Sequence, residues 1–162
     1  MKYHLSHLVA ASLGERASFY VQEGARALDK DLEIDFLQGE IWFIRTNQGI
    51  YAQGRLQTRV NMTCVRCLES LSYPLDFEIA EQYLFSYPED AQEPVYLVTV
   101  DGTIDITEPT RQQIWVSLPA HPLCRPDCRG LCSHCGANLN YETCTCREEV
   151  IDPRLAILKK LL

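Results

Sequence analysis

Polar and mostly apolar side chains alternate from Arg55 to Cys64. Leucine, threonine, valine, methionine and cysteine at the even positions 56 to 64 share one face, and polar side chains occupy the other. A period of two over ten residues is typical of a half-buried antiparallel strand. A second such run begins at Tyr73 and reaches Ile79. The sequence therefore predicts a pair of strands with Cys64 and Cys67 at or near the end of their hairpin.

Other short runs predict further β-structure. Residues 32–36 and 40–45 are rich in β-branched and aromatic side chains, and 95–100 resembles them. The last run follows an acidic, proline-bearing loop over 87–94, and Asp101-Gly102 after it predicts a turn.

Two helices are expected towards the C-terminus. The first spans about Glu108 to Leu118, where Thr107 is a candidate N-cap, Pro109 suits the first turn and Pro119 ends the helix. The second follows Asp152-Pro153 and carries leucines at 155, 158, 161 and 162 on one stripe. Such a stripe favours docking on the rest of the fold, and a partner-binding helix is the alternative.

These elements predict an α+β fold. We expect a mainly antiparallel β-sheet or a partly closed barrel, a helix near 108–118, a cysteine-rich zinc-knuckle segment and a short C-terminal helix. A β-rich domain over 1–120 and a cysteine-rich segment over 121–162 are expected to form one structural unit, because 162 residues suit a single domain.

The charge of the chain argues against broad nucleic-acid binding. Its 15 basic and 22 acidic residues give a formal net charge of −7, so contact with RNA would need a local basic patch or a partner protein. No apolar run has the length of a signal peptide or a membrane span. We therefore expect a cytoplasmic protein, no membrane contact and no small-molecule substrate.

Eight cysteines carry the candidate chemistry, and six of them lie between 124 and 146. A reducing cytosol favours metal over disulfides. Cys132 and Cys135, followed by a glycine, form a metal knuckle, and Cys144 and Cys146 complete a first set of four thiolates. We expect one or two Zn²⁺ ions.

The remaining cysteines offer a second site, Cys64, Cys67, Cys124 and Cys128, which would connect the hairpin to the later segment. Two alternatives stay open: Cys128 could replace a member of the first set, or one site could leave spare thiols. His121 and His134 are weaker candidate ligands, and His4 and His7 stand alone.

The all-sulfur donor set favours structural sites, because a catalytic zinc keeps an open position and recruits other ligands. No known catalytic motif accompanies the cysteines, so we expect no enzyme. Arginines near the cysteines offer a contact patch for RNA or a partner, with balance of the thiolate charge as the alternative. They are Arg55, Arg59, Arg66, Arg125 and Arg129, with Arg147 further along.

Several motifs from Cys64 onward resemble the bacterial YceD family, which is named for large ribosomal RNA subunit accumulation. They are Arg66-Cys67-Leu68-Glu69, Leu118-Pro119, Pro122-Leu123-Cys124, Cys128-Arg-Gly-Leu-Cys132, Cys135-Gly136, Asn138-Leu-Asn140, Cys144-Thr-Cys146 and Asp152-Pro-Arg-Leu155. The resemblance implies a non-enzymatic role in synthesis, processing or accumulation of large-subunit (23S) ribosomal RNA, with that RNA or a ribosome-assembly protein as partner. It also implies a metal site that supports the fold. A thiol-redox or iron–sulfur protein and a zinc-ribbon protein–protein adaptor are the alternatives.

Overall fold

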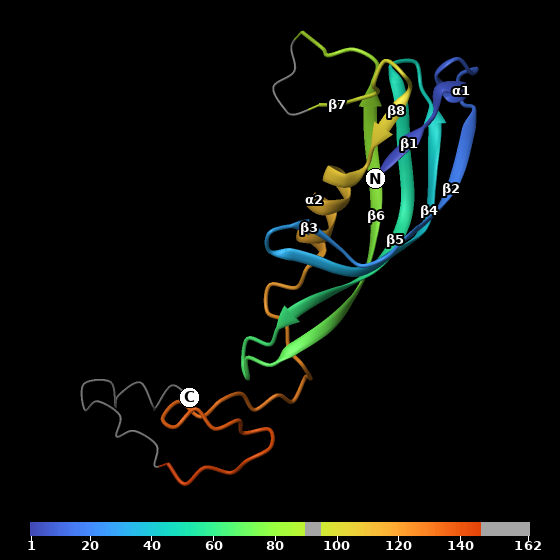
Figure 1. Cartoon of the computed structure of the whole chain (residues 1–162). Helices are drawn as coiled ribbons and strands as arrows, with labels where there is room; N and C mark the ends of the chain where they lie inside the picture. Colours follow the sequence, from blue (N-terminus) through green and yellow to red (C-terminus); the bar gives the residue numbers. More distant parts are fainter. Residues whose placement is uncertain (90–94, 147–162) are drawn as a thin grey trace, which may run out of the picture.

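Strands dominate the computed structural model, which describes residues 1–89 and 95–146 (Figure 1). In chain order the elements are β1 (Lys2–His4), α1 (Ser6–Val9), β2 (Arg16–Glu23), β3 (Arg26–Asp29), β4 (Leu32–Arg45), β5 (Gly49–Thr63), β6 (Ser70–Leu84), β7 (Tyr96–Leu97), β8 (Thr103–Asp105) and α2 (Thr107–Ser117). The C-terminal helix expected after Asp152 lies outside the described residues.

The main sheet has the order β2-β4-β5-β6-β7, and β3 follows β2 along the same edge of β4. The pairs from β2 to β6 are antiparallel, whereas β7 runs parallel to β6. The sheet is therefore mixed, with β6–β7 as its parallel pair among the described strands. Among the described strands β2 and β7 do not pair, so the sheet is open and the expected partial barrel is not formed.

The alternating runs form the longest strands. Leu56, Thr58 and Val60 are buried on one face of β5, and the polar residues between them are exposed, as predicted. The runs 32–36 and 40–45 are one strand, β4, whose pairing with β5 shifts register between Ile34 and Leu37. This β-bulge changes which positions of β4 are buried, from even to odd numbers. The sequence pattern therefore reads as two separate runs. The buried Thr58 hydroxyl donates to the Phe36 carbonyl there.

Two predictions about the chain after β6 need correction. The strand expected over 95–100 is only the two residues of β7. The expected helix is present as α2, but the Thr107 side chain does not cap it. Instead, Asp105 Oδ1 accepts a 2.9 Å hydrogen bond from the Thr107 backbone N–H. The carboxylate two residues earlier therefore satisfies this free donor of the first turn.

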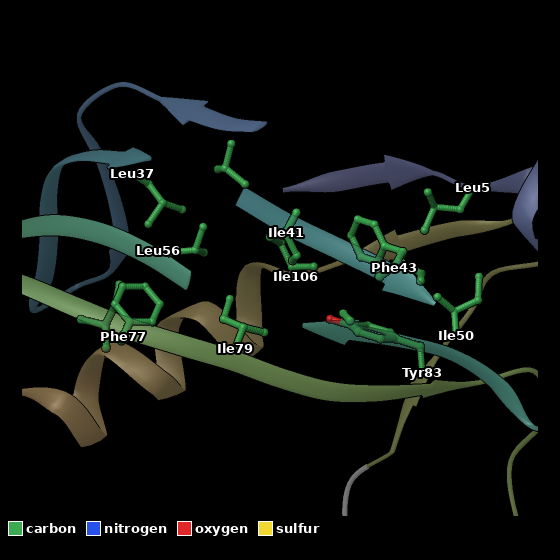
Figure 2. Close-up of a cluster of buried hydrophobic side chains, with 14 of the residues drawn as sticks. Leu5, Leu37, Ile41, Phe43, Ile50, Leu56, Phe77, Ile79, Tyr83 and Ile106 are labelled. Atoms are coloured by element: carbon green, nitrogen blue, oxygen red, sulfur yellow. The ribbon is translucent and has the colours of Figure 1, made fainter. Parts of the chain in front are cut away.

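The hydrophobic core lies on one side of the main sheet (Figure 2). Side chains from β4, β5 and β6 pack there against α2 and the small β1–β8 sheet, and Ile104, Ile106 and Ile114 come from that covering layer. The buried Tyr83 ring donates its hydroxyl to the Asp105 carbonyl at 3.2 Å. This layer fixes β6, and through it the hairpin that carries the first cysteines.

The β5–β6 hairpin reaches away from that core. Its pairs run without interruption from Gly49–Leu84 to Thr63–Ser70, and its far end meets the cysteine-rich segment (Figure 1). Three cysteines and three leucines form a separate, smaller cluster there. Within the described residues no helix is long and apolar enough to cross a membrane.

Candidate metal centre

The cysteines gather into two groups of four, whose sulfur atoms lie within 4.8 Å of one another in each group. We call Cys64, Cys67, Cys124 and Cys128 the hairpin site, and Cys132, Cys135, Cys144 and Cys146 the knuckle site. These are the two sets that the spacing suggested, and neither group includes His121 or His134. Cys128 lies with the hairpin cysteines. The alternative grouping, in which Cys128 replaces a member of the knuckle set, is therefore not formed.

Backbone hydrogen bonds place the hairpin ligands. The Cys64 N–H donates to the Glu69 carbonyl at 2.9 Å and the Leu68 N–H to the Cys64 carbonyl at 3.0 Å, so the turn closes on itself. Leu68, directly after the second cysteine, has a φ of 60°, the left-handed value that usually favours glycine. The Val65 N–H donates to the Pro122 carbonyl, which brings Cys124 beside this turn.

The knuckle site repeats the same turn with a glycine. Gly136, directly after Cys135, has a φ of 73° and donates its N–H to the Cys132 carbonyl at 3.0 Å. An isolated bridge between Leu131 and Asn138 closes the base of the loop. The predicted positive φ after the second knuckle cysteine is therefore present, and the hairpin site adopts it without a glycine.

The sulfur positions fit a single tetrahedral ion. Zinc–sulfur bonds of about 2.3 Å in a tetrahedron place the sulfur atoms about 3.8 Å apart. The Sγ–Sγ distances are 3.8 Å for Cys64–Cys128 and 3.5 Å for Cys67–Cys124 in the hairpin site. In the knuckle site the Cys144–Cys132 distance is 3.4 Å. All eight cysteines are free, so neither group is a pair of disulfides.

Three thiols have a pKa below that of an isolated cysteine: Cys64, Cys128, where the hydrogen bond from the Asn140 amide is the main cause, and Cys132. Backbone N–H groups, that of Cys67 foremost, lower the pKa of Cys64 to about 6 despite its burial. The Cys135 backbone N–H has the main share in lowering the pKa of Cys132 to about 6. At Cys67 the Glu69 backbone N–H acts in the same direction, but burial and the neighbouring thiols raise its pKa to about 12. Each set thus offers a first thiolate, and a bound cation would favour ionisation of the others.

The two sites differ in exposure. Cys64, Cys67 and Cys128 are 0–3% exposed, and only Cys124 of the hairpin site reaches the surface. In the knuckle site Cys135 and Cys146 are exposed. The hairpin site is therefore the better protected from solvent and from competing ligands.

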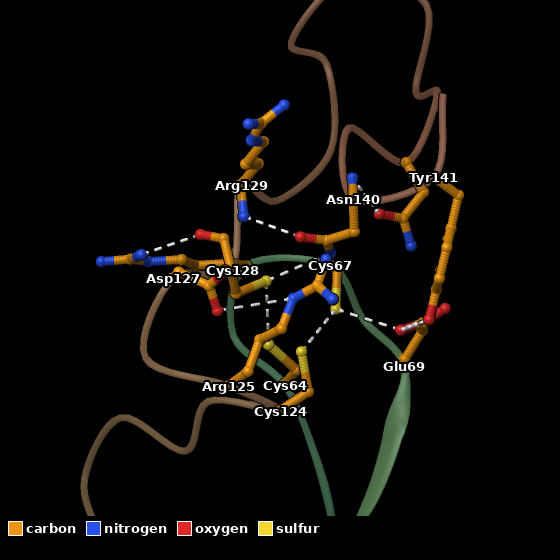
Figure 3. Close-up of polar contacts among 12 residues, drawn as sticks. Cys64, Cys67, Glu69, Cys124, Arg125, Asp127, Cys128, Arg129, Asn140 and Tyr141 are labelled. Atoms are coloured by element: carbon orange, nitrogen blue, oxygen red, sulfur yellow. Dashed lines mark hydrogen bonds and ion pairs between the residues drawn. The ribbon is translucent and has the colours of Figure 1, made fainter. Parts of the chain in front are cut away.

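Polar groups surround the hairpin site (Figure 3). Arg66 donates from Nη1 to the Cys128 carbonyl at 2.8 Å, and its own carbonyl accepts the Leu131 N–H at 3.1 Å. The Asn140 side-chain amide donates to Cys128 Sγ at 3.3 Å. Tyr141 donates its hydroxyl to Glu69 Oε2. The sequence did not predict Glu69, Asn140 or Tyr141 as site residues. Glu69 and Asn140 appeared only within motifs, and the contacts of all three depend on tertiary structure.

Arg147 lies outside the described residues, and the other five arginines do not line one face. Arg66 donates its side-chain hydrogen bond to the Cys128 carbonyl, and Arg125 Nε lies 3.7 Å from Asp127 Oδ1. Arg55 and Arg59 lie on the uncovered face of β5, where Arg55 forms a 2.7 Å ion pair with Asp76. The five residue steps from Arg59 to Cys64 correspond to about 17 Å of extended chain. Contact of these arginines with RNA or a partner stays a prediction.

Comparison with known proteins identifies one matching family. The family model described as large ribosomal RNA subunit accumulation protein YceD matches residues 52–162, which include both cysteine sets. No solved structure matches the chain.

Among curated relatives, an uncharacterized protein of Mycobacterium tuberculosis is 33% identical over 147 residues, 88% of this chain and 65% of that protein. The uncharacterized protein YlbN of Bacillus subtilis is 28% identical over 102 residues, 62% and 59% of the two chains. A Zea mays protein named large ribosomal RNA subunit accumulation protein YCED homolog 1, chloroplastic, is 37% identical over 59 residues, 36% and 20%. The chain thus spans less than two thirds of the length of these relatives, and on the family match it belongs to the YceD family.

Proposed function

We propose that this chain is a non-enzymatic factor that supports the synthesis, processing or accumulation of large-subunit ribosomal RNA and that two structural Zn²⁺ ions stabilise it. The ribosomal part is supported by the family description and by the name of the maize relative. The metal part is carried by one observation, the two compact groups of four sulfur atoms.

Closed sites support a structural role for the metal. Four thiolates fill a tetrahedral coordination sphere and leave no position for a water molecule or a substrate. Zn²⁺ held this way would contribute to folding and would supply no reaction centre. A cluster of several iron and sulfide atoms would also need its thiolates farther apart than a single ion does, which favours zinc over an iron–sulfur protein.

The charge of the loaded protein limits direct contact with RNA. Eight thiolates with two Zn²⁺ ions add about four negative charges to the formal −7 of the chain. We therefore infer that the protein acts in the cytoplasm through a ribosome-assembly protein, or touches RNA only through a restricted group of arginines. Arg125 and Arg129 beside the hairpin site are the candidates for that group.

Metal analysis tests the first part of this proposal. Protein purified without oxygen is expected to contain two Zn²⁺ per chain and to show no visible absorption, because Zn²⁺ has a filled d shell. Inductively coupled plasma mass spectrometry and an absorption spectrum give both quantities. Iron with a brown colour would contradict the zinc proposal in favour of the redox alternative.

Depletion in the organism that encodes the chain tests the ribosomal part. We expect the ratio of 23S to 16S ribosomal RNA to fall on depletion and to recover when the wild-type chain is expressed again. Northern blots or sequencing coverage over both RNAs measure the ratio. An unchanged ratio in depleted cells would contradict the ribosomal role whatever the metal content.

A further inference from the structure

The loop that belongs to the knuckle site also contacts the hairpin site. This loop runs from Cys135 to Cys144, and its Asn140 and Tyr141 lie beside the hairpin cysteines rather than at the knuckle (Figure 3). Residues that support one set of four thiolates are thus held in place by the chain of the other set. The arrangement raises the question of how the two sites depend on each other.

Asn140 has a fixed orientation. Its Oδ1 accepts a 2.8 Å hydrogen bond from the Arg129 backbone N–H, which can only donate, so the oxygen end of the amide is identified. The Nδ2 end therefore points at Cys128 Sγ, 3.3 Å away. The Asn140 backbone N–H is in turn held by Asn138 Oδ1 at 3.0 Å.

The acceptor of this hydrogen bond is a buried sulfur. Cys128 is only 3% exposed, so water does not replace a donor that is withdrawn. A metal-bound thiolate keeps lone pairs that accept N–H donors, and a hydrogen bond to a charged acceptor is stronger than a neutral one. Donors around a metal ligand orient it and commonly change metal affinity by about 10- to 100-fold.

The knuckle site closes the loop that positions this donor. Asn140 lies five residues after Cys135 and four before Cys144, and these two cysteines lie within 4.8 Å of each other at the sulfur atoms. An ion held by both would restrain the ends of the loop. Backbone contacts of the same loop, Leu139 N–H to the Gly130 carbonyl at 2.9 Å, continue the connection towards Cys128.

We propose that Asn140 couples the two metal sites. An ion in the knuckle site holds the loop from Cys135 to Cys144 so that the Asn140 amide stays hydrogen-bonded to Cys128, and each ion thereby strengthens binding of the other. The effect is reciprocal, because a binding free energy shared between two sites acts equally on both. This inference rests on the metal part of the proposed function and does not involve the ribosomal part.

The test is a thermodynamic cycle on the full chain. Affinity of the hairpin site for Zn²⁺ is measured by competition with a chromophoric chelator in the wild type, in Asn140→Ala, in the knuckle-deleted variant Cys144→Ser/Cys146→Ser, and in the triple variant. We expect Asn140→Ala and the knuckle deletion each to weaken the hairpin site by about 10- to 100-fold. The triple variant is expected to be no weaker than the worse of the two, because both act through the same hydrogen bond.

Two further variants keep the test independent of folding defects. Asn140→Asp keeps an oxygen for the Arg129 N–H and replaces the donor by a carboxylate oxygen beside the sulfur, so it should weaken the site at least as much as alanine. Asn47→Ala, in the turn between β4 and β5, is the matched control and should leave the affinity unchanged. Cobalt(II) absorption reports whether four sulfur ligands remain in each variant.

The outcomes separate the two proposals. A wild type that binds neither Zn²⁺ nor Co²⁺ contradicts the metal proposal itself. Two bound ions with equal hairpin affinity in Asn140→Ala and wild type overturn the coupling alone. Losses that add in the triple variant also overturn it, because they would mean that the knuckle site acts on the hairpin site by another route.

Discussion

Replacing Cys128 by serine is expected to remove the ion from the hairpin site and to unfold the chain from about 121 to 131, while the main sheet and the knuckle site stay folded. Between Leu118 and Cys146 the described chain contains one isolated bridge and no helix or longer strand. Among the described residues, its buried cluster is shared with the hairpin: Cys128, Leu123 and Leu131 pack there with Cys64, Cys67 and Leu71. Structural zinc contributes about 10–16 kcal/mol to small domains of this kind, so little else would hold the segment in place.

Native mass spectrometry and amide hydrogen exchange measure this outcome. Two ions per chain are expected in the wild type and no more than one in Cys128→Ser, with exchange protection lost over 121–131 and kept in β4, β5 and β6. Thr145→Ser, between two knuckle ligands, is a conservative control that should behave as wild type. Retention of both ions and of the protection in Cys128→Ser would show that the segment is held by packing instead.

Local pattern was enough to predict the long strands and the Cys132–Cys135 knuckle. The alternation on β5 follows from burial of one face only, and every residue of it is visible in the sequence. Spacing suggested the two sets of four but left other divisions open, with Cys128 in the first set or with a single site and spare thiols. The approach of Cys124 and Cys128 to the hairpin needed the contact between Val65 and Pro122, which no local signal indicates.

Features that depend on neighbouring chains escaped prediction. The bulge between Ile34 and Leu37 is a property of pairing between β4 and β5, so the sequence of β4 alone reads as two strands. The parallel pairing of β7 with β6 is likewise set by the chain's path, because two residues of strand carry no pattern of their own. Asn140 could be recognised only once the loop was seen against Cys128.

The second large effect is expected in the main core, where Phe43→Ala should reduce the free energy of unfolding by about 3–5 kcal/mol. Phe43 is fully buried near the C-terminal end of β4, and its ring centroid lies 5.2 Å from that of Tyr3 and 5.8 Å from that of Phe19. Its partners on the neighbouring strands are Ala17 and Ala52. Because these small side chains cannot extend into the vacated space, the cavity would stay open, which places the cost in the upper range for such a substitution.

Urea unfolding followed by circular dichroism measures the loss, and Trp42→Ala is the matched control. Trp42 directly precedes Phe43 on β4, is 37% exposed and points to the uncovered face, so its removal should cost about 1 kcal/mol or less. Equal losses for the two variants would contradict the position of the core. Below its unfolding transition Phe43→Ala should still bind two metal ions, because the buried clusters of the sheet and of the hairpin site share no residue.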